Sequence, residues 1–394
     1  MTRTRRAALA AALVLLVGAP PSAADAPSTH AAEEIVSTVA AGDPLGVVVT
    51  TTGPDGAPRF RTTPAASRSD ARSLVRSALS RGLTVSMAQP VRVTASNDTY
   101  RSRQWALDTL RAETAWKTSK GGSSSRRVVV AVVDTGVATD HPDLRDNLVA
   151  GRDVLDPGTA PSDENGHGTH VAGIVAAVAG NGRGIAGLAP RAAVMPVRVL
   201  DADGAGSTDD VARGITWAVQ HGATVVNLSL GSTRRDAALE RAVAHARSRG
   251  AVVVAAAGNS GGGLGCLLGC AAQYPAAYPG VIGVGSIDAN RSRSSFSTRG
   301  AWVDVVAPGG GIVSLVPRRN RIGCGTSTYC TLSGTSMATP YVSAAVALAR
   351  HVRGWNGTTT ADRVLSTATD LGPRGRDDAY GHGLVDPVAL LGAR

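Results

Sequence analysis

Aromatic residues are scarce in this chain: Phe, Trp and Tyr together make up 3% of its 394 residues. Charged residues are also few, at 18%, whereas 43% of the residues are hydrophobic and 47 are glycine. This balance excludes a wholly disordered chain. With so few large rings, small side chains must fill the interior. The length then allows one large domain together with smaller segments.

Long hydrophobic runs are missing after the first residues, and no later segment approaches the roughly 18 apolar residues needed to span a bilayer. Residues 1–26 differ from the rest. A basic start, Arg3 to Arg6, is followed by the apolar run 7–17, and Ala24-Asp25-Ala26 offers a small-residue cleavage site. This pattern is typical of a signal peptide, although a buried N-terminal helix is the alternative. We expect a secreted product without a membrane anchor.

Basic runs interleaved with aromatic residues are also missing, although the formal net charge is +10. The arginines are scattered along the chain and several lie in residues 1–26. Nucleic acid binding usually shows a concentrated basic surface. We therefore expect no nucleic acid partner. We also expect the protein to be a monomer.

Cysteine is limited to four residues: Cys266, Cys270, Cys324 and Cys330. In a secreted chain they are expected to form disulfides, and four cysteines allow three pairings. The two close pairs favour Cys266–Cys270 and Cys324–Cys330. A zinc site is the alternative, but the spacings lack the two-residue knuckle common in zinc sites.

Strand and helix patterns alternate from about residue 97 onward. Continuous apolar, β-branched runs are typical of parallel strands buried on both faces, and stretches with helical character lie between them. The expected strands are 127–133, 193–199, 223–228, 251–256 and 281–286, and the expected helices are 168–179, 209–221 and 235–249. This order predicts an α/β fold: a doubly wound, mostly parallel sheet with helices on both faces.

A second, smaller α/β module precedes this body. Residues 46–52 and 83–87 have strand character, residues 53–56 form a turn signal, and residues 70–81 have helical periodicity.

Three polar residues stand where an open α/β sheet binds ligands, at the carboxyl ends of strands or at helix starts. Asp134 follows the first strand, His167 begins a glycine-flanked helix, and Ser336 begins a later helix. Taken singly, each has an ordinary role as a turn or cap residue. His170 follows His167 by three residues, a weak metal signal, and we expect it to be structural.

Taken together, the motifs VDTG (133–136), HGTHVAG (167–173) and GTSMATP (334–340) resemble the subtilisin superfamily in its order of Asp, His and Ser. The resemblance covers roughly residues 97–388, and residues 97–98, 102–105 and 184–187 are similar to the thermitase branch. It implies a subtilisin-like serine endopeptidase whose triad is Asp134, His167 and Ser336. Asn259, in the motif AAAGNS (255–260), would help to stabilise the oxyanion.

Two other functions remain open at this point. One is a catalytically silent subtilisin fold that binds peptides. The other is an esterase, which would use a Gly-x-Ser-x-Gly elbow, and residues 334–338 depart from that pattern. One departure lies inside the third signature, where Tyr341 and Ser343 replace the His and Ala frequent in relatives.

The resemblance also implies a substrate cleft. An extended peptide would pair with two strand edges and enter a primary specificity pocket lined partly by residues 261–273. That loop contains no Asp or Glu, so a buried carboxylate selecting Arg or Lys is not expected. We expect apolar or aromatic residues before the scissile bond. The implied contact residues are Ser229, Leu230, Gly231, Gly204, Ala205, Gly206, Ala256, Ala257 and Gly258.

Calcium is the one cofactor that the resemblance implies, and no organic cofactor is expected. Calcium prefers six to eight oxygen ligands. Side chains and backbone carbonyls would both contribute, from Asp98, Asp143, Val178, Asn181, Arg183 and Ile185. The alternative is a loop closed by hydrogen bonds with Arg183 as its cation. A second site near Asp153 and Asp156 looks degraded.

The chain should then divide into a signal peptide (1–26), a pro-segment (27–96) and a catalytic domain (97–394). The pro-segment would be an intramolecular inhibitor, and polypeptides would be the substrates. If Asp98 is a ligand, cleavage must precede it, near residues 93–97. An N-terminal domain that stays attached is the alternative.

Overall fold

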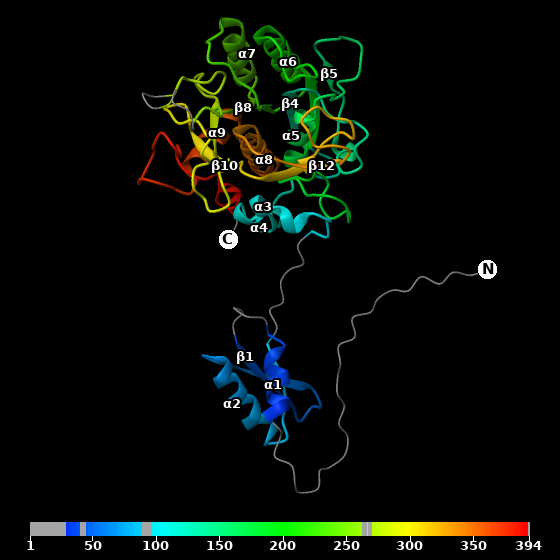
Figure 1. The fold of residues 1–394 in the computed structure, drawn as a ribbon, viewed down its shortest axis with the longest axis vertical. Helices are drawn as coiled ribbons and strands as arrows, with labels where there is room; N and C mark the ends of the chain where they lie inside the picture. Colours follow the sequence, from blue (N-terminus) through cyan, green and yellow to red (C-terminus); the bar gives the residue numbers. More distant parts are fainter. Residues whose placement is uncertain (1–28, 40–44, 89–95, 262–265, 267–269, 393–394) are drawn as a thin grey trace, which may run out of the picture. The chain divides into compact units, whose positions relative to one another are not determined.

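The computed structural model describes residues 29–39, 45–88, 96–261, 266 and 270–392 (Figure 1). The chain divides into two compact units, residues 1–93 and 94–394, which we describe separately. The expected signal peptide lies outside the described residues, as do residues 93–95 of the expected cleavage segment. None of the described helices is long and apolar enough to cross a bilayer.

The N-terminal unit is a three-stranded antiparallel sheet, in the order β2-β1-β3, with two helices packed on it. Its elements are α1 (Thr29–Ser37), β1 (Gly46–Thr52), β2 (Pro58–Pro64), α2 (Arg68–Leu79) and β3 (Thr84–Met87). Ala32, Val36, Val47 and Val75 form a core of its own. The strands and helix expected around 46–52, 70–81 and 83–87 are present. The sequence patterns missed β2 because all its side chains are exposed.

The C-terminal unit is built on a seven-stranded sheet in the order β10-β9-β8-β7-β4-β6-β5. Every neighbouring pair is parallel, as the sequence predicts. The strands are β4 (Val129–Asp134), β5 (Arg152–Asp153), β6 (Ala193–Arg198), β7 (Val225–Leu228), β8 (Val252–Ala256), β9 (Ile282–Ile287) and β10 (Val305–Pro308). A small antiparallel pair, β11 (Ile312–Leu315) and β12 (Tyr329–Leu332), lies beside it.

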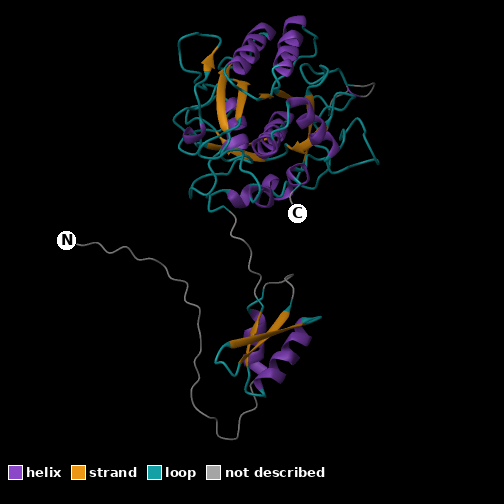
Figure 2. Cartoon of the chain, turned by 180° about the vertical axis from the view of Figure 1, so that it is seen from behind, coloured by secondary structure: helices purple, strands orange, loops and turns teal. Residues whose placement is uncertain are grey.

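Helices cover both faces of this sheet (Figures 1 and 2). Successive side chains of a strand point to opposite faces. Val130 and Val132 pack in the cluster that includes α5 and α8, whereas Ala131 and Val133 pack in the cluster that includes α6 and α7. The helices are α3 (Trp105–Thr109), α4 (Ala112–Trp116), α5 (His167–Ala176), α6 (Thr208–Gln220), α7 (Ala237–Ser248), α8 (Thr335–Arg353), α9 (Gly357–Ser366) and α10 (Pro387–Leu391). Two 3-10 turns, Arg101–Arg103 and Arg145–Asn147, complete the unit.

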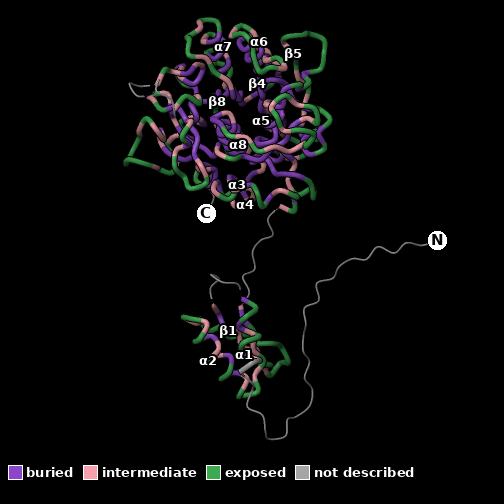
Figure 3. Tube along the Cα trace, in the orientation of Figure 1, coloured by how far each residue is buried: buried purple, intermediate pink, exposed green. Residues whose placement is uncertain are grey.

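The central strands and most of α8, from Met337 to Ala349, are buried (Figure 3). After β4 the chain builds β5 and β6 on one side, and then crosses to β7 on the other. The order of strands therefore reverses between β4 and β7. Open α/β sheets bind ligands at the carboxyl ends of the strands at such a point.

Close contact between α5 and β4 depends on one glycine. A Cβ atom at Gly168 would clash with the Gly136 carbonyl oxygen, far inside van der Waals contact. Gly168 thus lets the start of α5 rest against the end of β4, and this contact brings His167 to Asp134.

Candidate active site

The four residues expected to carry chemistry gather at the carboxyl ends of β4 and β8. Asp134 is the last residue of β4, and His167 is the first residue of α5. Ser336 is the second residue of α8, and Asn259 lies three residues beyond β8. Two strand ends and two helix starts therefore present these side chains to a common space.

Asp134 and His167 form the tightest contact of the site. His167 Nδ1 lies 2.7 Å from Asp134 Oδ1, which also accepts the Thr135 backbone N–H at 2.8 Å. The Asp134 side chain is fully buried, whereas that of His167 keeps 23% of its exposure. Asp134 Oδ2 has no hydrogen-bond partner in the described part of the chain. The carboxylate is thus free to stabilise a cation on His167 while the ring stays accessible.

The charge of the pair determines how His167 titrates. Burial disfavours the charged imidazolium, but the charge and hydrogen bond of Asp134, together with the charge of Asp163, more than offset this. The pKa of His167 is therefore raised above its ordinary value of about 6.5. A general base must be unprotonated, so this shift moves the onset of activity to higher pH.

We accordingly expect kcat/KM to rise with pH along an acid limb whose midpoint lies above about 6.5. The measurement is kcat/KM for a neutral peptide substrate from about pH 5 to 10, spanning the ordinary histidine pKa, with the unfolding temperature recorded at each pH. A midpoint below about 6.5 in folded protein would mean that Asp134 does not hold the imidazolium.

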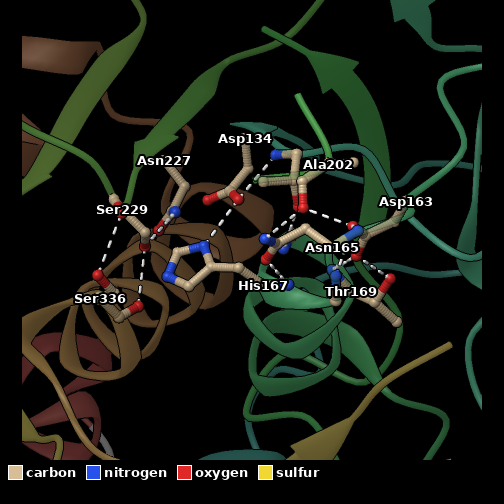
Figure 4. A network of polar contacts seen from close by, with 12 residues as sticks. Asp134, Asp163, Asn165, His167, Thr169, Ala202, Asn227, Ser229 and Ser336 are labelled. Atoms are coloured by element: carbon tan, nitrogen blue, oxygen red, sulfur yellow. Dashed lines mark hydrogen bonds and ion pairs between the residues drawn. The ribbon is translucent and has the colours of Figure 1, made fainter. Parts of the chain in front are cut away.

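Ser336 and Ser229 are joined by two reciprocal hydrogen bonds (Figure 4). The Ser336 hydroxyl donates to the Ser229 carbonyl at 3.1 Å, and the Ser229 hydroxyl donates to the Ser336 carbonyl at 2.8 Å. The His167 ring lies between Asp134 and Ser336 in this view. The described contacts include no hydrogen bond from Ser336 to His167. A rotation of the serine hydroxyl away from Ser229 is needed to make one, and such bonds are often loose before substrate binds.

Asn259 is oriented by Thr335. Its side-chain oxygen accepts both the backbone N–H and the hydroxyl of Thr335, each at 2.9 Å. Because the amide oxygen accepts these two hydrogen bonds, the amide nitrogen points away from Thr335. It lies near Gly334, where an added Cβ atom would be 3.4 Å from it. The start of α8 supplies the Ser336 backbone N–H in the same region. These two donors are suited to stabilising an oxyanion.

A buried aspartate that the sequence patterns did not single out organises the approach to His167. Asp163 accepts hydrogen bonds from Thr135 Oγ1 at 2.8 Å, from Gly166 N at 2.8 Å, and from Thr169 Oγ1 at 2.6 Å. It therefore ties the end of β4 to the first turn of α5. Burial raises its pKa despite these bonds. In the sequence, only its position shortly before the start of a helix could have indicated this role for Asp163.

Ser343, the departure noted in the third signature, joins a buried polar chain behind Ser336. Ser343 donates to Asn227 Oδ1 at 2.8 Å, and Asn227 Nδ2 donates to Ser229 Oγ at 3.0 Å. Ser229 in turn donates to the Ser336 carbonyl. This series of hydrogen bonds connects the interior of α8 to the end of β7, so it helps to position the helix that carries Ser336.

His170 has the structural role that we expect. It is fully buried, and its Nε2 lies 3.1 Å from the Cys330 carbonyl. Burial lowers its pKa to about 3, so it remains neutral. Across the described residues, no group of three or more His, Cys, Asp and Glu side chains is gathered as a metal site.

A cavity of about 500 Å³ opens beside His167. Both strand edges expected to bind a peptide line it: Ser229, Leu230, Gly231, Gly204, Ala205 and Gly206. Ala256, Ala257 and Gly258 lie outside its lining, at the end of β8, where Ala256 and Ala257 are buried. Gly258 packs against Gln273, since a Cβ atom there would approach Gln273 Cγ to 2.6 Å.

The disulfides are Cys266–Cys270 and Cys324–Cys330, the favoured pairing, and none of the described cysteines is free for zinc. The first bond lies in the loop expected to border the primary specificity pocket. Residues 262–265 and 267–269 of that loop lie outside the described residues.

Carboxylate and amide side chains meet at the expected calcium loop. Asn181 Nδ2 donates to Asp143 Oδ1 at 2.7 Å, and the backbone N–H groups of Gly180 and Asn181 donate to Asp98 at 3.0 and 3.1 Å. Burial raises the pKa of Asp143 to about 6, and the charge of Asp98 adds to the increase. Two buried, mutually repelling carboxylates form a donor set of oxygens that suits calcium.

At the second, degraded calcium position near Asp153 and Asp156, an arginine pairs with the carboxylate. Arg198 Nη1 lies 2.9 Å from Asp153 Oδ2, and Asp153 Oδ1 accepts the backbone N–H groups of Leu155 and Asp156. Both oxygens of Asp153 are therefore used.

Comparison with known proteins identifies the family. Residues 125–383 match the model of the Subtilase family, peptidase S8. The chain is 45% identical to thermitase from Thermoactinomyces vulgaris over 292 residues, covering 72% of this chain and 97% of thermitase. It is 42% identical to subtilisin Savinase from Lederbergia lenta over 290 residues, covering 73% and 98%.

A solved structure of a protease from Pseudoalteromonas arctica PAMC 21717 aligns with a TM-score of 0.66 and 32% identity. The alignment covers 76% of this chain and 99% of the other. These relatives support the endopeptidase interpretation. The chain belongs to the subtilase family and is a subtilisin-type serine endopeptidase.

Proposed function

We propose that this chain hydrolyses peptide bonds through an acyl-enzyme formed on Ser336. His167 is the general base, Asp134 orients it, and Asn259 with the Ser336 backbone N–H binds the oxyanion. The observation that carries the proposal is the 2.7 Å contact between buried Asp134 and accessible His167, with the imidazole beside Ser336 (Figure 4).

The first half of the reaction forms the acyl-enzyme. His167 Nε2 takes the proton of the Ser336 hydroxyl as its oxygen attacks the scissile carbonyl. Asp134 accepts the hydrogen bond of the Nδ1–H, which fixes the tautomer and stabilises the imidazolium. The carbonyl oxygen becomes an oxyanion between Asn259 Nδ2 and the Ser336 N–H. The imidazolium then protonates the leaving amine, and the peptide bond breaks.

The second half restores the enzyme. His167 takes a proton from water, which attacks the acyl carbonyl through the same oxyanion contacts. The tetrahedral intermediate collapses, Ser336 leaves with the proton held by His167, and a carboxylic acid product is released. Both halves use groups of this chain together with one water molecule.

The substrate is an extended polypeptide held between the edges at Ser229–Gly231 and Gly204–Gly206. Main-chain pairing of this kind tolerates many sequences. We propose a preference for apolar or aromatic side chains before the scissile bond, because residues 261–273 supply no carboxylate. Ala256, Ala257 and Gly258 would form one wall of that pocket.

We propose that the enzyme is a secreted monomer, with residues 1–26 as signal peptide, 27–96 as inhibitory pro-segment and 97–394 as catalytic domain. The division into two parts is supported by the N-terminal unit, which has a separate core around Val36, Val47 and Val75, as an independently folding module requires.

Casein hydrolysis by the processed protein, with and without a serine-directed phosphonate, tests the proposed activity. We expect hydrolysis that the phosphonate abolishes and that a metal chelator does not stop at once. Folded, processed protein that leaves casein intact would contradict the proposal.

Calcium is proposed as a structural ion. Asp98, Asp143 and Asn181 would hold it with the carbonyls of Val178, Arg183 and Ile185, and it would neutralise the two buried carboxylates. A ligand at about 100 times its Kd stabilises the folded state by about 2.7 kcal/mol, which corresponds to roughly 5–10 °C in Tm for a large domain. The contribution would be to stability rather than to chemistry.

We therefore expect EDTA to lower Tm by roughly 5–10 °C and added calcium to restore it. Asp143→Asn should remove this calcium response, whereas Asp146→Asn, a nearby exposed residue, should keep it. Thermal unfolding with and without calcium measures both. If Tm does not depend on calcium in the parent protein, the loop is closed by its hydrogen bonds, with Arg183 as its cation.

A further inference from the structure

The loop between β11 and β12 is unusually long for a hairpin. Most hairpin loops have about two to five residues, whereas here residues 316–328 join the two strands. The Cys324–Cys330 disulfide closes the second half, and the Val316 N–H donates to the Thr328 carbonyl at 2.9 Å. We call residues 316–330 the disulfide loop.

Asn320 holds the turn of the disulfide loop from inside. Its side-chain oxygen accepts the Cys324 N–H at 3.2 Å, and its amide donates to the carbonyls of Pro317 at 3.1 Å and Gly325 at 3.3 Å. The disulfide and these three bonds give Ile322, which lies between them, a defined position.

Two contacts attach the disulfide loop to the catalytic cleft. The Arg321 backbone N–H donates to the Asn165 carbonyl at 2.8 Å, and Arg321 Nη1 pairs with Asp203 Oδ1 at 2.7 Å. Asn165 also donates its amide to the Ala202 carbonyl at 3.0 Å. The disulfide loop, the residues before His167 and the substrate edge that begins at Gly204 are thereby joined.

Ile322 is the apolar side chain that this arrangement brings into the cleft. It lines the 500 Å³ cavity together with His167, Asp203 and Leu200. It also covers the turn before His167, since a Cβ atom at Gly166 would lie 3.0 Å from Ile322 Cδ1. Gly166 has φ +114, so glycine is favoured there by both backbone and space. Ile322 and the general base His167 therefore line the same cavity.

We propose that Ile322 limits the size of the substrate side chain at P2, the residue immediately before the P1 residue of the scissile bond. This inference rests on the proposed function. In an extended peptide successive side chains point to opposite sides. If P1 enters the pocket beside Ala256–Gly258, P2 faces His167 and the edge at Gly204. Ile322 occupies that space, and the disulfide and Arg321 keep it there.

The test compares two peptide p-nitroanilides with the same P1 residue and either Ala or Phe at P2. The readout is the ratio of kcat/KM for the Phe substrate to that for the Ala substrate, which does not depend on the fraction of active enzyme. Removing apolar bulk from a pocket changes discrimination by about 10-fold or more. Ile322→Ala should raise this ratio about 10-fold, and Ile322→Trp should lower it.

Val352→Ala is the matched control, because Val352 is a 40% exposed apolar residue at the end of α8; its ratio should equal that of the parent protein. An unchanged ratio in both Ile322 variants would overturn the assignment of Ile322 while leaving the proposed function intact. A parent protein that hydrolyses neither peptide nor casein would instead refute the proposed function.

Discussion

Ser336→Ala is expected to lower kcat by about six orders of magnitude. Loss of the serine or the histidine of subtilisin, a relative of this chain, lowers kcat by about 2 × 10⁶, and we expect a similar loss here. The physical reason is that the triad acts as a unit: without the Ser336 hydroxyl, His167 has no proton to accept. Donors for the oxyanion remain, so a small residual rate over water is expected.

The measurement is steady-state kcat with a chromogenic peptide, using protein freed of its N-terminal segment by an unrelated protease that is then removed, with a Tm that matches that of the parent. Ser333→Ala is the matched control. Ser333 lies in the same segment, and its hydroxyl accepts the Gly311 N–H at 2.9 Å, away from the reacting groups. A Ser336→Ala protein that keeps a hundredth or more of the parent rate would show that another residue is the nucleophile.

The same variant reports on maturation. If the enzyme removes its own N-terminal segment, full-length Ser336→Ala should accumulate uncleaved and become cleaved when active parent enzyme is added. Mass spectrometry of the secreted product gives the new N-terminus, which we expect near residues 93–97. Normal processing of the variant by itself would mean that another protease does this work.

Asp134→Asn is expected to lower kcat by about 10⁴, the loss known for the corresponding change in trypsin, which carries the same triad on an unrelated fold. An asparagine amide would donate to Nδ1 of His167, which places the ring proton on Nε2, where Ser336 needs an acceptor. Asp134 is fully buried, so the side chain that replaces it keeps its place, but an amide nitrogen facing Nδ1 gives up the hydrogen bond that Oδ1 accepts from the Thr135 N–H. The shape of the site should therefore be kept while the tautomer is wrong.

A second readout separates the loss of the correct tautomer from simple damage to the fold. Removing the Asp134 charge removes the main cause that raises the pKa of His167, while burial continues to lower it. The acid limb of the residual kcat/KM should therefore move to lower pH than in the parent protein. Asp140→Asn, at an exposed position nearby, should leave both kcat and the limb unchanged. An unshifted limb in Asp134→Asn would contradict the role given to Asp134.

The central sheet could be predicted because its signal is local. Runs such as 251–256 are apolar and β-branched over most of their length, as strands buried on both faces require. β2 gave no such signal because its side chains are all exposed. The short strand β10 was also missed. The helix expected over 168–179 ends at Ala176, because Ala177 leaves the helical backbone at φ −56 and ψ 141.

The residues of the candidate site were found through short motifs, whereas their supports depend on contacts between distant segments. Asp163 contacts Thr135 across 28 positions, and Ser343 contacts Asn227 across 116. Neither pairing leaves a periodic pattern in the chain. Ile322 belongs to no motif at all, and only the disulfide loop and its contact to Asn165 place it beside His167.

The most direct test of Ser336 as the nucleophile is to find where a serine-directed phosphonate becomes attached. Processed enzyme is inactivated with the reagent, digested with a second protease, and mapped by mass spectrometry. We predict a single adduct per molecule, on Ser336, and much slower labelling when Asp134 is replaced by Asn. Inactivation with the adduct on any other residue, or full activity with Ser336 modified, would contradict the triad.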